Sequence, residues 1–248
     1  MSNNVVCPLC GENDSRLIMD HLRFDKKADV YQCSECKLVF LDQNSFEYPS
    51  DFYEKEYHQS YLTHVEPDAL DPKAYYEKMK KTTKLWAERF MGMLNGNETV
   101  LDMGCSTGHF MDLIKSKTGA LHGYDLNANE VNFCKNELGL NVSNAPLADR
   151  FEENTFDYIT LIFVLEHIAD PVAFLNHLKK FLKPDGKLLI VVPNISDPLV
   201  SLYEIPEFRS FYYCIEHLFY YNHKSITALF EKANLKGEVG TVQEYPLA

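Results

Sequence analysis

The sequence contains no apolar run long enough to cross a membrane, and no signal peptide precedes its first cysteine. Met1-Ser2-Asn3-Asn4 leads almost directly into a pair of cysteines. A chain without either feature is expected to remain in the cytoplasm, where thiols stay reduced. We therefore expect a cytoplasmic protein with no insertion into the membrane.

Positive charge is also scarce. The 248 residues include 24 Lys and Arg against 36 Asp and Glu, which gives a net charge of −12. This balance disfavours sequence-independent binding to nucleic acid phosphates, so no nucleic acid partner is expected. The hydrophobic content of 46% is typical of a globular protein, and the length suits one ordinary domain plus a small module.

Four of the seven cysteines form a pattern near the N-terminus. Two C-x-x-C pairs, about twenty residues apart, have the spacing of a zinc site with four thiolates: Cys7, Cys10, Cys33 and Cys36. Gly11 and Lys37 follow the pairs, where a tight turn lets backbone amides point at sulfur. A disulfide pair and a redox dithiol are the alternatives. Four protein ligands leave no open position, so residues 1–45 are predicted to form a zinc ribbon with a structural ion.

Residues 46–97 are predicted to form an aromatic helical connector. Over Lys73 to Leu94 the spacing of threes and fours predicts one long helix, and the residues that recur are Tyr76, Met79, Thr83, Trp86 and Phe90. The aromatic residues before this helix have two interpretations. In the first, they pack the ribbon onto the larger domain. In the second, one of them, Tyr53 or Tyr57, reaches across a cofactor pocket as a lid.

A glycine-rich turn follows the connector and opens the third segment, residues 98–248. Val100 and Leu101 read as a buried strand that ends at Asp102, and Gly104 and Gly108 permit a close backbone approach to a ligand. No Gly-Lys-Ser/Thr follows, so the turn is not a Walker loop. Since Asp102 would repel a pyrophosphate, the turn suits a cationic or amine-bearing ligand better.

Strands and helices alternate after this turn, which predicts an α/β fold with a doubly wound, mostly parallel, Rossmann-like sheet. Asp125 ends the second strand about twenty residues past the turn, where a carboxylate can accept hydrogen bonds from ribose hydroxyls. Lys236 to Tyr245 is predicted to begin a sixth strand. The sequence ends at Ala248, where a seventh strand is expected, so the domain is interpreted as truncated at strand six.

Four motifs in order resemble those of the class I S-adenosylmethionine (SAM)-dependent methyltransferases. They cover about residues 98–193: the glycine-rich turn itself, Gly123-Tyr124-Asp125-Leu126, the segment from Phe156 to Pro171 that contains Leu165-Glu166-His167, and Leu182-Lys183-Pro184-Asp185-Gly186-Lys187-Leu188. The sequence departs from the family where Ser106 replaces the usual glycine of the first motif. It also lacks the acidic residue often found after strand three.

The resemblance implies a set of cofactor contacts. Asp102 and the backbone of the turn would hold the methionine end of SAM, and Asp125 the ribose. The turn residues are Gly104, Cys105, Ser106 and Gly108. Leu126, Ala145 and Pro146 would flank the adenine, and the backbone around Ile162 would close the methionine side.

The acceptor must lose a proton if it is a hydroxyl or a carbon next to a carbonyl. The resemblance places Glu166 and His167 beside the transferred methyl, and we interpret His167 as the base because its ordinary pKa lies near neutrality. Glu166 would orient it or share its role, or only brace the glycine turn. His217 is a second candidate, with a packing histidine as the alternative.

A ribbon, an aromatic connector and a methyltransferase domain together resemble the sugar C-methyltransferases and related enzymes of polysaccharide and natural-product pathways. The resemblance implies SAM-dependent C- or O-methylation of a small-molecule acceptor, a sugar or nucleotide-linked sugar. The alternatives are a methyltransferase of nucleic acid or protein that uses the ribbon for recognition, and a non-catalytic SAM-binding partner protein. The sequence leaves the oligomeric state open.

Overall fold

A computed structural model describes residues 5–46, 71–203 and 205–242. The chain divides into two compact units, each assembled from separate stretches of sequence. We call Pro49–Ile162 with His177–Ile190 the core unit. Met1–Tyr48, Phe163–Asn176 and Val191–Ala248 form the ribbon unit. The two tyrosines predicted to form a lid, Tyr53 and Tyr57, lie outside the described residues.

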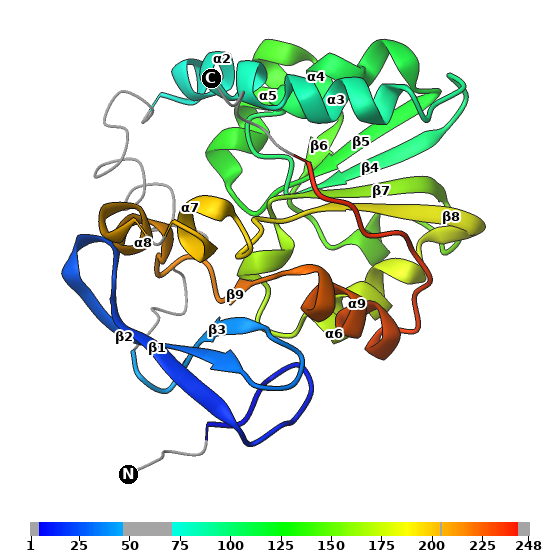
Figure 1. The fold of residues 1–248 in the computed structure, drawn as a ribbon. Helices are drawn as coiled ribbons and strands as arrows, with labels where there is room; N and C mark the ends of the chain where they lie inside the picture. The colour runs from blue at the N-terminus through cyan, green and yellow to red at the C-terminus, as the bar shows by residue number, and fades with distance from the viewer. Residues whose placement is uncertain (1–4, 47–70, 204, 243–248) are drawn as a thin grey trace. The chain divides into compact units, whose positions relative to one another are not determined.

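The core unit is built on a five-stranded sheet with the strand order β6-β5-β4-β7-β8 (Figure 1). The strands are β4 (Thr99–Met103), β5 (Ala120–Tyr124), β6 (Val142–Ser143), β7 (Phe156–Ile162) and β8 (Leu182–Val191). β4 is central and pairs in parallel with both β5 and β7, while β6 pairs in parallel with β5. The predicted Rossmann-like sheet is confirmed. Its order brings the ends of β4 and β5 together, as a ligand site requires.

Four helices of the core unit cover one face of this sheet (Figure 1). They are α2 (Pro72–Thr82), α3 (Lys84–Met91), α4 (His109–Ile114) and α5 (Ala128–Leu138). Local signals set the ends of α5: the side chain of Asn127 accepts from the Asn129 amide, and Gly139 closes the helix at φ 64°. The sequence predicts a cap at Asn127 or Asn129 and a stop at Gly139, and the structure has the cap at Asn127.

The single helix predicted over Lys73 to Leu94 is wrong in one respect: it is two helices separated at Thr83. The hydroxyl of Thr83 donates to the Met79 carbonyl at 2.6 Å, and the same carbonyl accepts from the Thr83 amide at 2.9 Å. A buried threonine that bonds back to the preceding turn competes with the helical backbone pattern. The spacing of Tyr76, Met79, Thr83, Trp86 and Phe90 that predicted the helix carries no information about this bond.

Asp112 on α4 ties α2 to the rest of the core unit. Its carboxylate accepts from the Tyr76 hydroxyl at 2.7 Å and pairs with Lys80 and Lys115. These partners outweigh the effect of burial and lower the pKa of Asp112 to about 2. The connector helix is thereby held to the helix that begins at the glycine-rich turn.

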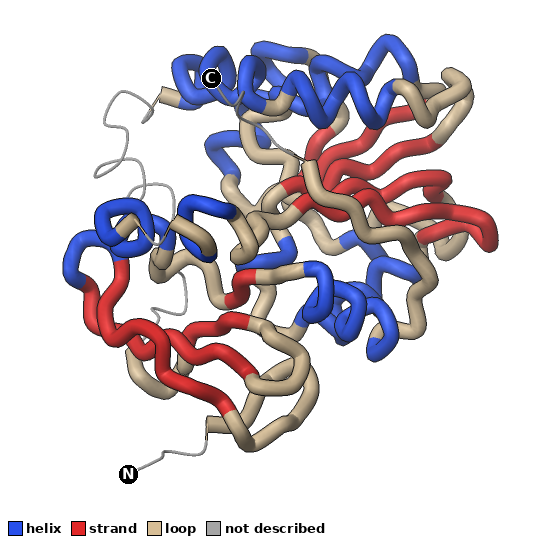
Figure 2. Tube along the Cα trace, viewed as in Figure 1, coloured by secondary structure: helices blue, strands red, loops and turns tan. Residues whose placement is uncertain are grey.

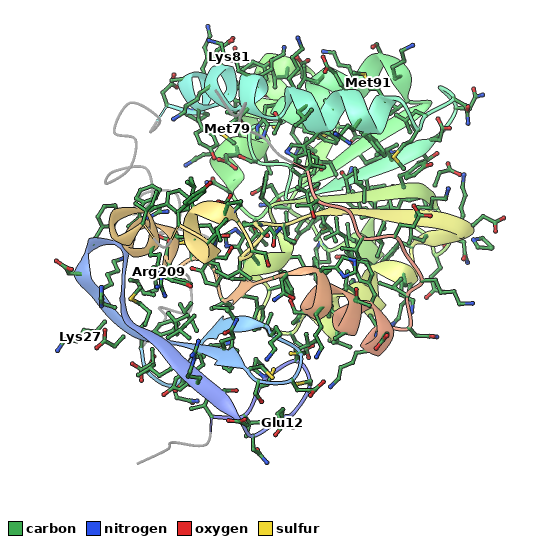
Figure 3. All side chains as sticks on the ribbon, in the orientation of Figure 1. Glu12, Lys27, Met79, Lys81, Met91 and Arg209 are labelled. Atoms are coloured by element: carbon green, nitrogen blue, oxygen red, sulfur yellow. The ribbon has the colours of Figure 1, made fainter. Side chains whose placement is uncertain are left out.

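The ribbon unit contains a second, antiparallel sheet in the order β1-β2-β3-β9 (Figure 1). Its strands are β1 (Ser15–Leu22), β2 (Lys26–Cys33), β3 (Val39–Leu41) and β9 (Phe219–Tyr220). On β2, Ala28 and Val30 are buried, whereas Lys27 is exposed and extends away from the strand (Figure 3). The alternation is that of a sheet with one face toward a core.

The sheet of the ribbon unit is completed by β9, a strand from the C-terminal part of the chain. It lies almost 180 residues after β3 in the sequence, yet it completes the N-terminal sheet through the pairs Val39–Tyr220 and Phe40–Phe219. The helices of this unit, α7 (Pro198–Ser201), α8 (Pro206–Tyr212) and α9 (His223–Lys232), also come from the C-terminal part. The domain boundaries predicted at residues 45 and 97 divide the chain into consecutive segments. Each compact unit instead combines segments that are far apart in the sequence. α6 (Pro171–Lys179) begins in one unit and ends in the other.

The strand predicted over Lys236 to Tyr245 is wrong for its described part. Residues 235–242 form no strand and are drawn as loop in Figure 2. Apolar residues are sparse there, with only Val239 and Val242 after Leu235. Within the described residues, no helix is both long and apolar enough to cross a membrane.

Gly123 on β5 leaves no room for a side chain beneath the glycine-rich turn. A Cβ at this position would lie 2.6 Å from Met111 Sδ and 2.9 Å from both Cys105 Sγ and Val142 Cγ2. We expect Gly123→Ala to lower the free energy of unfolding by roughly 1–3 kcal/mol, as overpacking of a dense core does. Urea denaturation measures the change. Gly240→Ala is the control, because nothing lies within 4 Å of a Cβ there, and equal stability of the two variants would refute the packing argument.

Candidate cofactor site and two side-chain clusters

Asp102 lies near the carboxyl end of the central strand β4 and is only 3% exposed. Thr160, on the neighbouring strand β7, donates its hydroxyl proton to Asp102 Oδ1 at 2.6 Å. Burial raises the pKa of Asp102 to about 7; the Thr160 bond opposes this shift, and the charge of Asp125 adds to it. A buried carboxylate in this state is stabilised by a bound cation. The prediction of an amine-bearing ligand is consistent with this environment.

The glycine-rich turn is held in shape by its own backbone. The amides of Gly104 and Cys105 both donate to the Tyr124 carbonyl, at 2.8 and 3.0 Å, and the Gly108 amide donates to the Cys105 carbonyl. Gly104, Ser106 and Gly108 have φ values of 75°, 47° and 73°. Ser106 thus keeps the left-handed conformation that a glycine would provide. The sequence differs from the family at this position, but the backbone conformation that the turn requires is retained.

Cys105 contributes no side chain to a ligand surface. Its thiol is buried in a cluster with Met111, Val131 and Cys134, and burial raises its pKa well above the usual value. Any contact of Cys105 with a cofactor is restricted to its backbone. The side chain anchors the turn to α4 and α5 instead.

Asp125 follows the end of β5, and both of its carboxylate oxygens are fixed by backbone amides. Oδ2 accepts from the Ser106 amide at 2.7 Å and Oδ1 accepts from the Asn127 amide at 2.9 Å. Each carboxylate oxygen has a second lone pair, so an oriented carboxylate of this kind can also accept from a pair of vicinal hydroxyls. The geometry suits the predicted ribose contact and ties it to the glycine-rich turn.

The residues predicted to flank adenine follow the ends of two paired strands. Leu126 comes after β5 and is 49% exposed, while Ala145 and Pro146 come after β6, and Pro146 is exposed. The amide of Asp125 donates to the Ser143 carbonyl at 3.2 Å, which fixes the two strand ends together. An exposed leucine and proline at this edge provide apolar surface for a planar ring. Ile162, the last residue of β7, is partly buried against the core.

One polar residue of this site, Thr160, was not predicted from the sequence. Its hydroxyl interrupts the apolar run of β7, and this was the available signal for a partner of Asp102. Ser106, by contrast, was predicted to contact the cofactor. The buried hydroxyl oxygen of Ser106 lacks a hydrogen-bond partner among the described residues. Such a group at a ligand-binding turn is satisfied when a bound molecule supplies the partner.

The raised pKa of Asp102 predicts a pH-dependent affinity for SAM. Its ammonium group favours ionised Asp102, so a fall in pH through the pKa of about 7 weakens binding. We expect S-adenosylhomocysteine, which keeps this ammonium, to bind roughly eightfold more weakly at about pH 6 than at about pH 7.5. Calorimetric titration measures this ratio. Asp102→Asn should flatten the profile, and equal slopes for the variant and the wild type would contradict the assignment.

The four N-terminal cysteines converge in the ribbon unit. Their sulfur atoms all lie within 4.8 Å of one another, with Cys7 Sγ 3.6 Å from Cys36 Sγ and Cys10 Sγ 3.4 Å from Cys33 Sγ. All four are free thiols, and neither distance is that of a disulfide. The arrangement fits four ligands around one ion at zinc–sulfur bonds of about 2.3 Å.

The backbone after each cysteine pair has the geometry expected of a zinc knuckle. Gly11 and Lys37 both adopt left-handed conformations, with φ values of 80° and 62°. Hydrogen bonds from the Leu9 and Cys10 amides help to lower the pKa of Cys7 to about 5, after the larger effect of a hydrogen bond with Cys36. Amides that point at sulfur stabilise thiolates, which are the form that binds metal.

A second cluster brings together the three residues predicted to be catalytic. Glu166 and His167 lie in a short 3-10 helix, Leu165–His167, which follows β7 in the chain, and His217 precedes β9. Ligand atoms of all three lie within 4.8 Å of one another, and the two imidazole rings are 4.8 Å apart. The Leu218 amide donates to the Glu166 carbonyl at 2.9 Å, which joins the two segments. Residues about 50 positions apart in sequence thus form one polar group.

Burial dominates the electrostatics of this cluster. It raises the pKa of Glu166 to about 7 and lowers that of His167 to about 3. It also lowers the pKa of His217, against the attraction of Glu166 and Glu216. The expectation that His167 titrates near neutrality therefore fails in this environment. Its imidazole is neutral, with Nδ1 donating to the Glu216 carbonyl at 2.7 Å.

Comparison with known proteins identifies the family. Residues 73–238 match the family model described as a methyltransferase domain, which covers more than half of the chain. The chain therefore belongs to this family. It is 27% identical over 156 residues to a demethylmenaquinone methyltransferase of Oceanobacillus iheyensis, a match that covers 58% of this chain and 63% of that protein. Against the first curated relatives, the chain spans about half to just under two thirds of their length.

Solved structures share the fold at low sequence identity. A SAM-dependent methyltransferase from Thermotoga maritima is 16% identical with a TM-score of 0.52, over 71% of this chain and 78% of that one. A protein from Pyrococcus horikoshii is 19% identical with a TM-score of 0.51, over 73% and 88%. These likenesses establish a class I methyltransferase fold.

Proposed function

We propose that the protein transfers the methyl group of SAM to a small-molecule acceptor. The observation that carries this proposal is the pair of carboxylates at neighbouring strand ends of a methyltransferase-family domain: Asp102 buried against Thr160, and Asp125 fixed by two amides. Asp102 would pair with an ammonium group, and Asp125 would accept from the two hydroxyls of a ribose. These are the polar groups at the two ends of one amino-acid–nucleoside cofactor. The curated relatives named as demethylmenaquinone methyltransferases support a small organic acceptor.

The residues of the core unit fit SAM in chemical type. Asp102 would pair with the ammonium of its methionine part, the Ser106 hydroxyl would supply a hydrogen bond, and Asp125 would accept from the ribose. Leu126 and Pro146 would contact the adenine. SAM supplies an activated methyl group on sulfur, so the contribution of the protein is alignment, which accounts for roughly 7–11 kcal/mol in well-oriented reactions.

The Glu166, His167 and His217 cluster is proposed to activate the acceptor. A hydroxyl or a carbon acid must lose a proton as the methyl group arrives, and a positioned group contributes about 10²–10⁴-fold. The bond from His167 Nδ1 to the Glu216 carbonyl orients the imidazole ring within the cluster. Glu166 supplies a negative charge to either imidazole. Buried and close together, these side chains are suited to polarise an acceptor group.

The four-cysteine cluster is proposed to hold a structural zinc ion. Four thiolates complete a tetrahedral shell, so no position remains for a substrate. The ion would hold the two knuckles in the ribbon unit, whose sheet includes β9. Because His217 lies two residues before β9, this ion would also stabilise the segment that carries one member of the acceptor-activating cluster.

A sugar or a nucleotide-linked sugar is the proposed acceptor class. The combination of a cysteine module with this methyltransferase domain supports it, through the resemblance to sugar C-methyltransferases. The test incubates the full chain with methyl-labelled SAM and three acceptor pools: nucleotide-linked sugars, tRNA and lysate protein. We expect label in the sugar pool only.

The same assay separates the rival functions. Label in tRNA or protein would replace the small-molecule acceptor with a macromolecule and give the ribbon a recognition role. A demethylmenaquinone arm tests the acceptor named for the relatives, and label there alone would exclude the sugar. Binding of S-adenosylhomocysteine without transfer to any pool would favour a non-catalytic partner protein.

A further inference from the structure

Several buried polar atoms around Glu166 have no hydrogen-bond partner. Glu166 is 0% exposed, and both of its carboxylate oxygens lack a partner among the described residues. The hydroxyl oxygens of Tyr212 and Tyr221 are buried and equally unpartnered within that part of the chain. Such groups are rare in native proteins, because each has lost its hydrogen bonds to water without replacing them. A ligand that supplies the partners explains why the fold retains them.

The two tyrosines lie within electrostatic reach of the Glu166 carboxylate. Its charge contributes to raising the pKa of both Tyr212 and Tyr221, after the larger effect of burial. The Leu218 amide, from the segment between the two tyrosines, donates to the Glu166 carbonyl at 2.9 Å and holds the chain segments together. Neither hydroxyl bonds to the carboxylate. A small molecule can therefore bridge the three side chains.

The neighbours of Glu166 connect this group of side chains to solvent and to free space. His217 offers a ring nitrogen within 4.8 Å of a Glu166 carboxylate oxygen, and its side chain is partly exposed. Tyr221 also lines a cavity of about 260 Å³, together with Phe219 and residues 169–172. Solvent access and space for a ligand of a few heavy atoms thus exist at the edge of the group.

One vicinal diol satisfies all of the unpartnered atoms at once. A carboxylate accepts hydrogen bonds and donates none, whereas a phenol hydroxyl both donates and accepts. The two hydroxyl protons of a diol can be donated to the two oxygens of Glu166. Its two oxygens can accept the hydroxyl protons of Tyr212 and Tyr221. An ammonium group only donates, so it would offer the tyrosine protons no acceptor, and the diol is the better match.

We infer that Glu166, Tyr212 and Tyr221 form a subsite that binds a vicinal diol of the acceptor. The inference rests on the proposed function and deepens it, since it names the part of a sugar-like acceptor that the ribbon unit recognises. The two tyrosines determine specificity and remove no proton. The subsite does not depend on His167, whose imidazole is already hydrogen-bonded to the backbone.

The probe is cis-cyclohexane-1,2-diol. Cyclohexanol is the matched ligand that lacks one hydroxyl, and cyclohexylamine is the ammonium ligand. The chain carries isotope-labelled tyrosine rings and is saturated with S-adenosylhomocysteine, whose ribose occupies Asp125 and keeps the probe from that carboxylate. Nuclear magnetic resonance titration follows the ring signals of Tyr212 and Tyr221, which Tyr212→Phe and Tyr221→Phe assign by their loss. We expect the diol to shift both signals with a millimolar dissociation constant, at least about tenfold tighter than either other ligand.

Substitutions in the subsite should weaken diol binding without unfolding the protein. Glu166→Gln and Tyr221→Phe are each expected to weaken it at least about fivefold, because each removes one hydrogen-bonding group that the diol uses. Tyr203→Phe is the matched control, since Tyr203 is a tyrosine of the same unit with 67% exposure, and should bind the diol as the wild type does. An unchanged circular dichroism spectrum of each variant shows that the fold is retained.

Urea denaturation without the probe gives a second, independent readout. Tyr212→Phe and Tyr221→Phe should keep or raise the urea midpoint, because the hydroxyl that is lost has no protein partner among the described residues. Tyr220→Phe should lower it, because the Tyr220 hydroxyl accepts from the Cys214 amide at 2.8 Å and donates to the Cys214 carbonyl at 3.1 Å. A lower midpoint in both Tyr212→Phe and Tyr221→Phe would show that their hydroxyls are already satisfied and would refute the subsite.

The titrations have equally clear contrary results. Equal affinity for the diol and cyclohexanol, tighter binding of cyclohexylamine, or unchanged diol binding in both Glu166→Gln and Tyr221→Phe would each overturn the inference. Diol binding that is lost when S-adenosylhomocysteine is added would place the probe at the cofactor site and have the same consequence. Failure of S-adenosylhomocysteine to bind the wild type would refute the proposed function alone, because selective binding of the diol would still establish the subsite.

Discussion

Asp102→Ala is expected to weaken SAM binding at least 30-fold, a loss of about 2 kcal/mol or more. The carboxylate is the buried acid at the end of β4, and its removal leaves the ammonium of the cofactor without an opposite charge. Because burial disfavours ionised Asp102, the variant is not expected to lose stability in the absence of ligand. Equilibrium dialysis with labelled SAM measures the change in affinity.

Two further variants make this result specific. Asp185→Ala removes an exposed acid from the same unit and should bind SAM as the wild type does. Thr160→Val removes the hydroxyl that donates to Asp102 and should weaken binding to a smaller extent. Near-wild-type affinity of Asp102→Ala would show that Asp102 does not hold the cofactor.

Cys33→Ser is expected to abolish tight zinc binding and to loosen the whole sheet of the ribbon unit. Cys33 is fully buried and belongs both to the cysteine cluster and to β2, the strand between β1 and β3. Structural zinc contributes several kcal/mol or more to the folding of small modules, so its loss should raise amide hydrogen exchange across β1, β2, β3 and β9. Mass-spectrometric exchange and the zinc content of the purified protein measure both effects.

The matched control is Cys214→Ser, which changes a buried cysteine of the same unit outside the cluster. It should keep one zinc ion per chain and normal protection of β1 to β3. S-adenosylhomocysteine should still bind to Cys33→Ser, because the cofactor residues belong to the core unit. Full zinc occupancy in Cys33→Ser would contradict a four-thiolate site.

The Rossmann-like sheet was predictable because each of its elements carries a local signal. The apolar run of β7, Asn127 before α5 and Gly139 after it are features of neighbouring residues, and the structure has each element in place. Asp102 and Asp125 could be identified as candidates for the same reason. Both stand at strand ends, and parallel strand order brings such ends together.

The features that the sequence did not predict depend on contacts between distant segments. Nothing near Phe219 and Tyr220 indicates that they extend the N-terminal sheet, since the signal for pairing lies in β3, almost 180 residues earlier. The low pKa of His167 likewise comes from burial beside His217, which no local pattern records. The break at Thr83 depends on one side-chain bond. Local periodicity thus predicts which segments form helices and strands. Strand pairing and the pKa values of buried side chains are set by tertiary packing.

Calorimetric titration of the wild-type chain with S-adenosylhomocysteine tests the central claim most directly. The claim is that the glycine-rich turn, Asp102 and Asp125 form the site of a SAM-dependent methyltransferase. It predicts saturable binding of one ligand per chain with a dissociation constant in the micromolar range, typical of cofactor sites and worth about 8 kcal/mol. Heats that show no saturation up to about 1 mM ligand would contradict it.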